Sequence, residues 1–439
     1  MLASEELFPT QASLPPLPVP SLADTRERYL ASLRPLLSPE DLAHTEELLN
    51  DFCRDGGGGA ELQQMLEERA GTERNWVEEW WEQLAYLRTR TTMAVHINWF
   101  GVIPDWGRPM SNVHAAALMI HGVCSVRSMI LGGKFPVEQM RGQPLDMHQF
   151  TRVFGMARVP QEGADVLHQV DDSRHVVVLR RGCILTVRVL DSRGNPLPLA
   201  ALVALMASAI AIADAHALLE ATDEPPVSVL TALGRDEWAR ERTRLLEDTT
   251  SAKSLAAVEA ALFVVALDHA CPATKEEAGQ LCLGGSGRDR WYDKSFTVVI
   301  FDNGRGGLNA EHTPVDAMTI VSIFVKVPGS RIHFPDVHPR AIDVISCASG
   351  GRCWASRAKP SRRAMRSPRS PHPSQWASRN RQSSNGPSTQ IELRRLRWRA
   401  RRSARWRVTW RCARSTSATS ARASLSGRSF TQTSSFRPR

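Results

Sequence analysis

The chain lacks cysteines paired at metal-binding spacing. Its 439 residues include eight cysteines, with no C-x-x-C pair and no histidine partners at the spacing of a zinc site. This scatter predicts no metal site and favours free thiols in a reducing compartment. The eight are Cys53, Cys124, Cys183, Cys271, Cys282, Cys347, Cys353 and Cys412.

The sequence also has little that would direct it to a membrane. Its start, MLASEELFPTQ, has neither the apolar core of a secretory signal nor the Arg-rich, acid-poor composition of an organelle presequence. The longest apolar run, 199–213, is alanine-rich, too short for a membrane span, and ends at Asp214. We therefore predict a soluble protein with no transmembrane segment, in which this run is a buried helix.

Acidic residues are almost absent from the last fifth of the chain. Of the 55 basic and 46 acidic residues, 23 basic residues and one acid, Glu392, lie in 347–439; the remaining 32 and 45 lie before it. The first part is therefore acidic, and the net charge of +9 arises from the tail. The basic pI is thus no argument for a specific nucleic-acid partner.

The same segment has almost no apolar periodicity. Its Arg, Ser and Pro composition cannot bury enough apolar surface to offset the chain entropy lost on folding. We expect 347–439 to be a low-complexity, disordered basic tail that packs on nothing. A gene-model error or a truncated product is preferred as its origin over a genuine disordered extension.

Before the tail, patterns typical of strands and helices are interspersed, with no internal repeats. Residues 174–180 and 183–190 predict a hairpin around Arg181-Gly182, and 228–234 and 296–301 predict further strands. Helices are expected over 26–37, 38–52, 75–90, 199–220, 235–248 and 254–268. In the third of these, Trp76, Trp80, Leu84 and Leu87 form a stripe that predicts core packing. The order favours an α/β or α+β layered domain.

One histidine lies at a predicted strand-to-helix junction, in LNAEHTPVDAM (308–318). After His312, Thr313 is suited to cap a helix, Pro314 to its first position, and Asp316 to the acidic third position of a capping box. Side chains at such junctions often face clefts. From these residues alone, His312 is either a catalytic base or a structural polar residue, and Asp316 is explained by capping.

Several stretches, in order, resemble the choline/carnitine acyltransferase family. They are LPPLPVPSLADTRERYL, NWVEEWWEQLAYLRTR, GQPLDMHQFTRVFGMARVP, LTALGRDEWARERTRLLED, SLAAVEAALFVVALD and DRWYDKSFTVVIFDNGRGGLNAEHTPVDAM. In the last, His312 falls on the histidine of the family's E-H-[ST]-x-x-[DE] element. The resemblance covers about 14–324 and implies a mixed-sheet α/β fold like chloramphenicol acetyltransferase. It predicts an incomplete family domain over 14–330, because the family's second, similar domain has no match after Phe324.

The resemblance implies acyl transfer between CoA and the hydroxyl of carnitine or choline, without an acyl-enzyme. His312 would be the proton acceptor, Asp316 would support it or cap the helix, and Glu311 would have no catalytic role. Carnitine is preferred because that branch of the family is broader. CoA or acyl-CoA would be a co-substrate, with no permanently bound cofactor and with its binding residues unassigned.

The expected partners are therefore small molecules, and the expected state is a monomer in the cytoplasm, a peroxisome or a mitochondrion. The chain as written should show little or no transfer, because half of the family's substrate tunnel is absent. The alternative from a different class is an inactive family member whose basic tail binds polyanions non-specifically.

Overall fold

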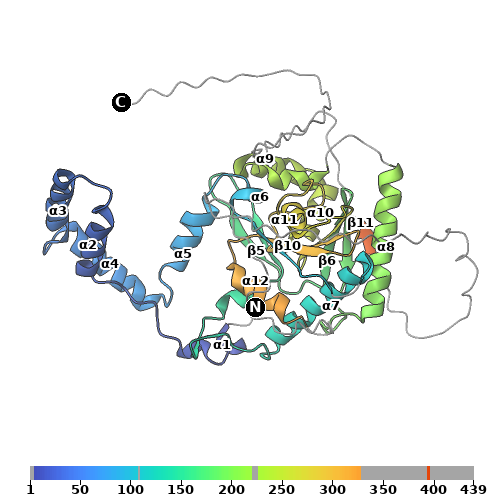
Figure 1. Ribbon diagram of the computed structural model, residues 1–439, viewed down its shortest axis with the longest axis horizontal. Coiled ribbons are helices and arrows are strands. Elements are labelled where there is room, and N and C mark those ends of the chain that lie inside the picture. The colour runs from blue at the N-terminus through green and yellow to red at the C-terminus, as the bar shows by residue number, and fades with distance from the viewer. Residues whose placement is uncertain (1–3, 107–108, 220–225, 328–392, 396–439) are drawn as a thin grey trace, which may run out of the picture. The chain divides into compact units, whose positions relative to one another are not determined.

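The computed structural model describes residues 4–106, 109–219, 226–327 and 393–395, in which a run of helices precedes the first strand and strands and helices are interspersed after it (Figure 1). The helices are α1 (Ser4–Leu7), η1 (Gln11–Ser13), α2 (Leu22–Leu33), α3 (Pro39–Cys53), α4 (Gly58–Thr72), α5 (Glu78–Trp81), η2 (Glu82–Leu87), α6 (Met93–His96), α7 (Asn112–Leu131), η3 (His148–Arg152), α8 (Leu199–Leu219), η4 (Val227–Ala232), α9 (Arg235–Leu246), α10 (Thr249–Glu259), α11 (Lys275–Leu283) and α12 (Ala317–Val325). The strands are β1 (Trp99–Val102), β2 (Gln139–Met140), β3 (Gln143–Pro144), β4 (Met156–Val159), β5 (Val166–Gln169), β6 (His175–Arg180), β7 (Cys183–Arg188), β8 (Val264–Asp268), β9 (Phe296–Phe301), β10 (Gly306–Ala310) and β11 (Leu393–Arg395).

A mixed sheet with the strand order β1-β10-β9-β8-β6-β7-β11 forms the centre of this fold. Strand β8 pairs in parallel with β6 and β9, and the other neighbours pair antiparallel. The two short pairs β2-β3 and β4-β5 lie outside it. The predicted mixed-sheet α/β class with many helices is confirmed.

Both faces of the central strands are buried. In β8, Val265 and Leu267 belong to the large core cluster that α7, α8 and α12 also line, whereas Ala266 faces a smaller cluster with Ala278 and Cys282 of α11. This two-residue alternation is that of a strand covered by helices on both sides. It explains why the sheet residues that precede the His312 loop are fixed in position.

The hairpin around Arg181-Gly182 is confirmed, because β6 and β7 pair antiparallel and both turn residues have positive φ, 49° and 77°. Two other expectations are wrong. The segment 228–234, predicted as a strand, lies mostly in the 3-10 helix η4, and the second half of the helix predicted over 254–268 is strand β8. A short apolar run such as FVVALD has no periodicity that separates a buried strand from a buried helix.

The tryptophan stripe does not form a core face. Trp80 and Leu84 are 43% and 70% exposed, whereas Leu87 is 5% exposed. Trp76 precedes α5 and Trp80 lies within it, whereas for Leu84 the cause is local, because α5 continues at Glu82 into the π-helical η2. The wider turn of a π-helix rotates later residues out of the 3.6-residue register on which the prediction rested.

By length and composition alone, α7 and α8 could each cross a membrane. Helix α7 packs on α8 and against β8 and β9, and α8 packs against β6 and β7. The predicted buried helix is present as α8, but only one of its faces is buried, including Leu202, Met206 and Ala209. Both helices contribute to the core of the sheet fold.

Of the predicted tail, only β11 is described. Its residues pair antiparallel with β7, with Leu393 opposite Val187 and Arg395 opposite Leu185. The expectation that nothing beyond 347 packs on the sheet is therefore wrong for these three residues, and the remaining predictions for the tail lie outside the described residues. Five cysteines lie in the described part and form no disulfide there, namely Cys53, Cys124, Cys183, Cys271 and Cys282.

Candidate active site

The loop that carries His312 is held by the sheet on one side and by α12 on the other. Strand β10 pairs with β9 up to Ala310, and the Glu311 N–H then donates to the Ser295 carbonyl at 3.0 Å. Helix α12 begins at Ala317, with Asp316 at its N-cap position. The prediction that Thr313 and Pro314 begin the helix is therefore wrong.

The side chain of His312 lies against Tyr86 of η2. The two rings are stacked, with centroids 5.8 Å apart and an interplanar angle of 15°, and the Tyr86 hydroxyl lies 3.3 Å from Nδ1. The His312 side chain is 30% exposed, so the ring that stacks on Tyr86 also reaches solvent. Burial raises the pKa of Tyr86, so its hydroxyl stays protonated at neutral pH.

Asp316 lies beside the other ring nitrogen. Its Oδ1 is 3.7 Å from Nε2 of His312, and its side chain is 60% exposed. The carboxylate makes no capping hydrogen bond. Instead, Gln149 Oε1 accepts hydrogen bonds at the start of α12, from the Asp316 N–H at 2.7 Å and from the Thr319 hydroxyl at 3.0 Å. Of the two roles considered for this carboxylate, the geometry favours an electrostatic one.

Glu311 points away from solvent and is completely buried. Its Oε1 accepts hydrogen bonds from the backbone N–H and the hydroxyl of Thr313, and it lies 3.5 Å from Nη1 of Arg158. Burial raises the pKa of this carboxyl group, an effect that the positive charge of Arg158 opposes. Glu311 therefore shapes the loop from below, while His312 faces outward.

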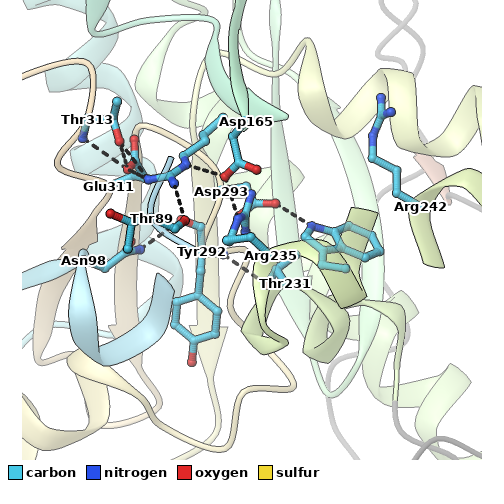
Figure 2. A network of polar contacts seen from close by, with 12 residues as sticks. Thr89, Asn98, Asp165, Thr231, Arg235, Arg242, Tyr292, Asp293, Glu311 and Thr313 are labelled. Atoms are coloured by element: carbon cyan, nitrogen blue, oxygen red, sulfur yellow. Dashed lines mark hydrogen bonds and ion pairs between the residues drawn. The ribbon is translucent and has the colours of Figure 1, made fainter. Parts of the chain in front are cut away.

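Beneath the loop lies a buried network of ion pairs (Figure 2). Asp165 accepts from Arg158 and Arg235, each through Nε at 2.7 Å. Arg235 also donates to Asp293 at 2.6 Å, and Asp293 accepts from the Trp238 indole at 2.7 Å. Burial raises the pKa of Asp293, and its arginine partner lowers it. Figure 2 shows the labelled members extending from Glu311 and Thr313 through Asp165 to Asp293 and Arg235.

Tyr86, Gln149 and this network were not predicted from the sequence. Tyr86 and Gln149 lie in the quoted stretches NWVEEWWEQLAYLRTR and GQPLDMHQFTRVFGMARVP, but no local pattern joins them to a residue more than 160 positions away. A charged residue inside a buried strand, such as Arg158 in MARV, was the one available signal. Within the described residues, no three His, Cys, Asp or Glu side chains form a group that could hold a metal ion.

The arrangement is suited to proton transfer. One imidazole nitrogen lies against a hydroxyl and the other beside an exposed carboxylate, an arrangement in which the ring can exchange a proton with a bound molecule. The nearby carboxylate would stabilise the positive charge that results.

The sequence is similar to a known protein family and to several characterised enzymes. A family model described as choline/carnitine O-acyltransferase matches residues 17–424, a range that extends past the motifs quoted above. Over 329 residues the chain is 33% identical to carnitine O-acetyltransferase of Columba livia, covering 71% of this chain and 52% of the relative. It is 30% identical over 339 residues to peroxisomal carnitine O-octanoyltransferase of Rattus norvegicus (73% and 54%). It is 33% identical over 336 residues to the human liver isoform of carnitine O-palmitoyltransferase 1 (72% and 42%). The chain thus spans about half the length of the first two relatives and less of the third.

Proposed function

Because the chain belongs to the choline/carnitine O-acyltransferase family, we propose that it transfers an acyl group between CoA and the hydroxyl of carnitine, with His312 as the proton acceptor. The observation that carries the proposal is the partly exposed imidazole of His312, whose Nδ1 lies 3.3 Å from the Tyr86 hydroxyl and whose Nε2 makes no hydrogen bond within the described residues. A base must reach the proton that it removes, and this edge of the ring is the one that a substrate can approach.

The chemistry follows from the two ring nitrogens. In the tautomer that the proposal requires, Nδ1 carries the proton and donates it to the Tyr86 hydroxyl oxygen, 3.3 Å away, which leaves the lone pair on Nε2. As the substrate oxygen attacks the thioester carbonyl carbon, Nε2 takes the hydroxyl proton. The carbon–sulfur bond then breaks, and the imidazolium returns that proton to the departing CoA thiolate. The acyl group passes directly from sulfur to oxygen, and the histidine ends neutral and ready for another turnover.

Asp316 has an electrostatic role in this scheme. Its Oδ1 lies 3.7 Å from Nε2, which is too far for a hydrogen bond, and a carboxylate has only acceptor oxygens, so it leaves the Nε2 lone pair to accept the substrate proton. Its negative charge stabilises the imidazolium that forms as the reaction proceeds.

Carnitine is proposed as the acceptor because the three relatives above are named as carnitine acyltransferases, of acetyl, octanoyl and palmitoyl groups. Acyl-CoA is the co-substrate. The proposal assigns no acyl-chain length, since the relatives cover three lengths at similar identity. Choline stays the alternative acceptor.

The test measures the release of free CoA thiol from acetyl-, octanoyl- and palmitoyl-CoA, with carnitine or choline as the acceptor. Two proteins are compared: the 439-residue chain, and a chimera in which residues 1–327 are joined to the carboxyl half of the pigeon enzyme. We expect carnitine-dependent release from the chimera, little from the chain alone, and none from His312→Ala.

The matched control is His44→Ala, which removes an imidazole on α3 that is 71% exposed and pairs only weakly, at 4.0 Å, with Glu47. This variant should keep full activity. A folded chimera that releases no CoA with either acceptor would instead favour an inactive family member.

A further inference from the structure

The guanidinium of Arg158, on β4, has an unusual set of partners. Its side chain is fully buried, and Nε donates to Asp165 at 2.7 Å. Nη1 donates to the hydroxyl of Thr313 at 3.1 Å and lies 3.5 Å from Glu311, while Nη2 donates to the backbone carbonyl of Tyr86 at 2.7 Å. One rigid group thus joins three segments that are far apart in the sequence.

Two of those segments hold the imidazole of His312 between them. Glu311 and Thr313 are its neighbours in the chain, and Tyr86 is the residue whose ring stacks on it and whose hydroxyl lies 3.3 Å from Nδ1. We propose that Arg158 is a positioning residue, which sets the place and the tautomer of His312 by fixing both the loop that carries it and the tyrosine against which it rests.

A purely structural role would be neutralisation of the buried Asp165, but that carboxylate has other cations. Arg235 donates to it at 2.7 Å and Arg90 at 3.1 Å. By contrast, Glu311 has Arg158 as its one ion-pair partner in the described part of the chain, and its Oε2 has no hydrogen-bond partner there. Loss of Arg158 would therefore affect the position of the His312 loop more than the charge balance of Asp165.

The chemistry of arginine suits this task and that of lysine does not. A guanidinium presents five donors in a fixed plane, so its Nε and two Nη groups reach partners in three directions at once. A lysine at the same position would keep the charge near Asp165 but could not hold Glu311, Thr313 and the Tyr86 carbonyl together. The inference rests on the proposed function for its meaning, because only a reacting imidazole needs such exact placement.

The experiment follows the ring-nitrogen chemical shifts of histidine in the labelled full chain, which report the tautomer and the hydrogen bonding of each imidazole. His312→Gln identifies the His312 signals. In Arg158→Lys we expect these signals to move or split as the ring loses its fixed contact with Tyr86. The signals should stay in place in Arg242→Lys, which alters a two-bond arginine pair with Glu259 at 2.8 and 3.0 Å. Figure 2 shows Arg242 on the opposite side of the network from Glu311.

A second pair of variants covers the case in which Arg158→Lys does not fold. Thr313→Val removes the hydroxyl that Arg158 contacts without changing any charge, and Thr313→Ser retains it. The positioning role predicts shifted His312 signals in Thr313→Val and restored ones in Thr313→Ser. Unchanged His312 signals in a folded Arg158→Lys, or in Thr313→Val where Arg158→Lys is unfolded, overturn the inference.

This experiment can be judged separately from the proposed function, because the chemical shifts of the His312 ring nitrogens are measured without any acyl transfer. In the chimera, Arg158→Lys should lower kcat with little change in KM, since the residue is buried away from substrate; a displacement of about 1 Å at a reacting group can cost about 10²-fold. If the signals move but no transfer occurs, the proposed function fails and the positioning stands. If transfer depends on His312 while its signals ignore Arg158, the positioning alone fails.

Discussion

Replacing Asp316 by asparagine tests how the carboxylate assists His312. The atoms Oδ1 and Nε2 are 3.7 Å apart. At such a distance, two unit charges interact by about 1 kcal/mol in water-like surroundings and by about 4 kcal/mol at an effective dielectric constant of ~20. Because the Asp316 side chain is 60% exposed and the His312 side chain 30% exposed, the lower figure applies. It corresponds to a loss of about five- to tenfold in kcat.

The assay is carnitine-dependent CoA release by the chimera at low and high salt. Asparagine is as good an N-cap residue as aspartate, so the melting temperature should not change. An exposed charge pair is screened by salt, so the difference between wild type and Asp316→Asn should shrink as ionic strength rises. A loss of a hundredfold or more that ignores salt would refute this reasoning, because it would mean that Asp316 itself moves a proton.

Three further predictions concern stability. Burial lowers the pKa of Lys294 from 10.5 to about 7, so between these pH values the unfolded chain binds more protons than the native one. The stability of wild type relative to Lys294→Met should therefore increase as the pH rises from about 7 to 10. A stability difference that stays constant with pH in denaturant titrations would contradict the lowered pKa. Gly304→Ala should lower the free energy of unfolding by about 1–3 kcal/mol more than Gly194→Ala. Both glycines have positive φ, but of the two only Gly304 would place a Cβ against a carbonyl oxygen, that of Met110 at 1.9 Å. Equal melting temperatures of the two variants would refute this clash. Leu87→Ala should lower the free energy of unfolding by about 2–5 kcal/mol and Leu84→Ala by under about 0.5 kcal/mol, since the two side chains are 5% and 70% exposed. Similar losses in the two variants would mean that Leu84 packs in the core after all.

The sequence predicted those elements whose determinants are local. The hairpin around Arg181-Gly182 follows from two residues at positive φ between β-branched runs. The helix predicted over 38–52 is α3, and its cap is local as well, because the Ser38 hydroxyl accepts from the Asp41 N–H at 3.1 Å. In both cases the residues that decide the structure are within three positions of one another.

The misses come from interactions between distant segments. Strand β8 is a strand because it pairs in parallel with β6 and β9, and a run of buried apolar residues does not contain that information. The start of α12 moved to Ala317 because Thr313 bonds to Glu311 instead of capping the helix, and Gln149, 167 positions away, takes over part of the cap. Local capping rules describe only partners that are near in the sequence.

In the candidate site, too, some residues could be predicted from the sequence and others could not. The resemblance singled out His312 and Asp316, and the fold brings them to 3.7 Å across one loop. Tyr86 and Arg158 escaped notice because they contact the loop from 226 and 155 positions away. Their roles depend on sheet and helix packing that a single sequence does not specify.

The central claim is that His312 is the proton acceptor, and the most direct test is the turnover of His312→Ala in the chimera beside its melting temperature. General-base catalysis contributes about 10²–10⁴-fold, and here one imidazole would serve both transfer directions, so we expect a loss at the upper end of that range. The melting temperature should hold, because the ring is 30% exposed and lies in a loop. Activity lost only in step with unfolding, or a smaller loss than that of Asp316→Asn, would contradict the assignment and leave His312 a structural histidine.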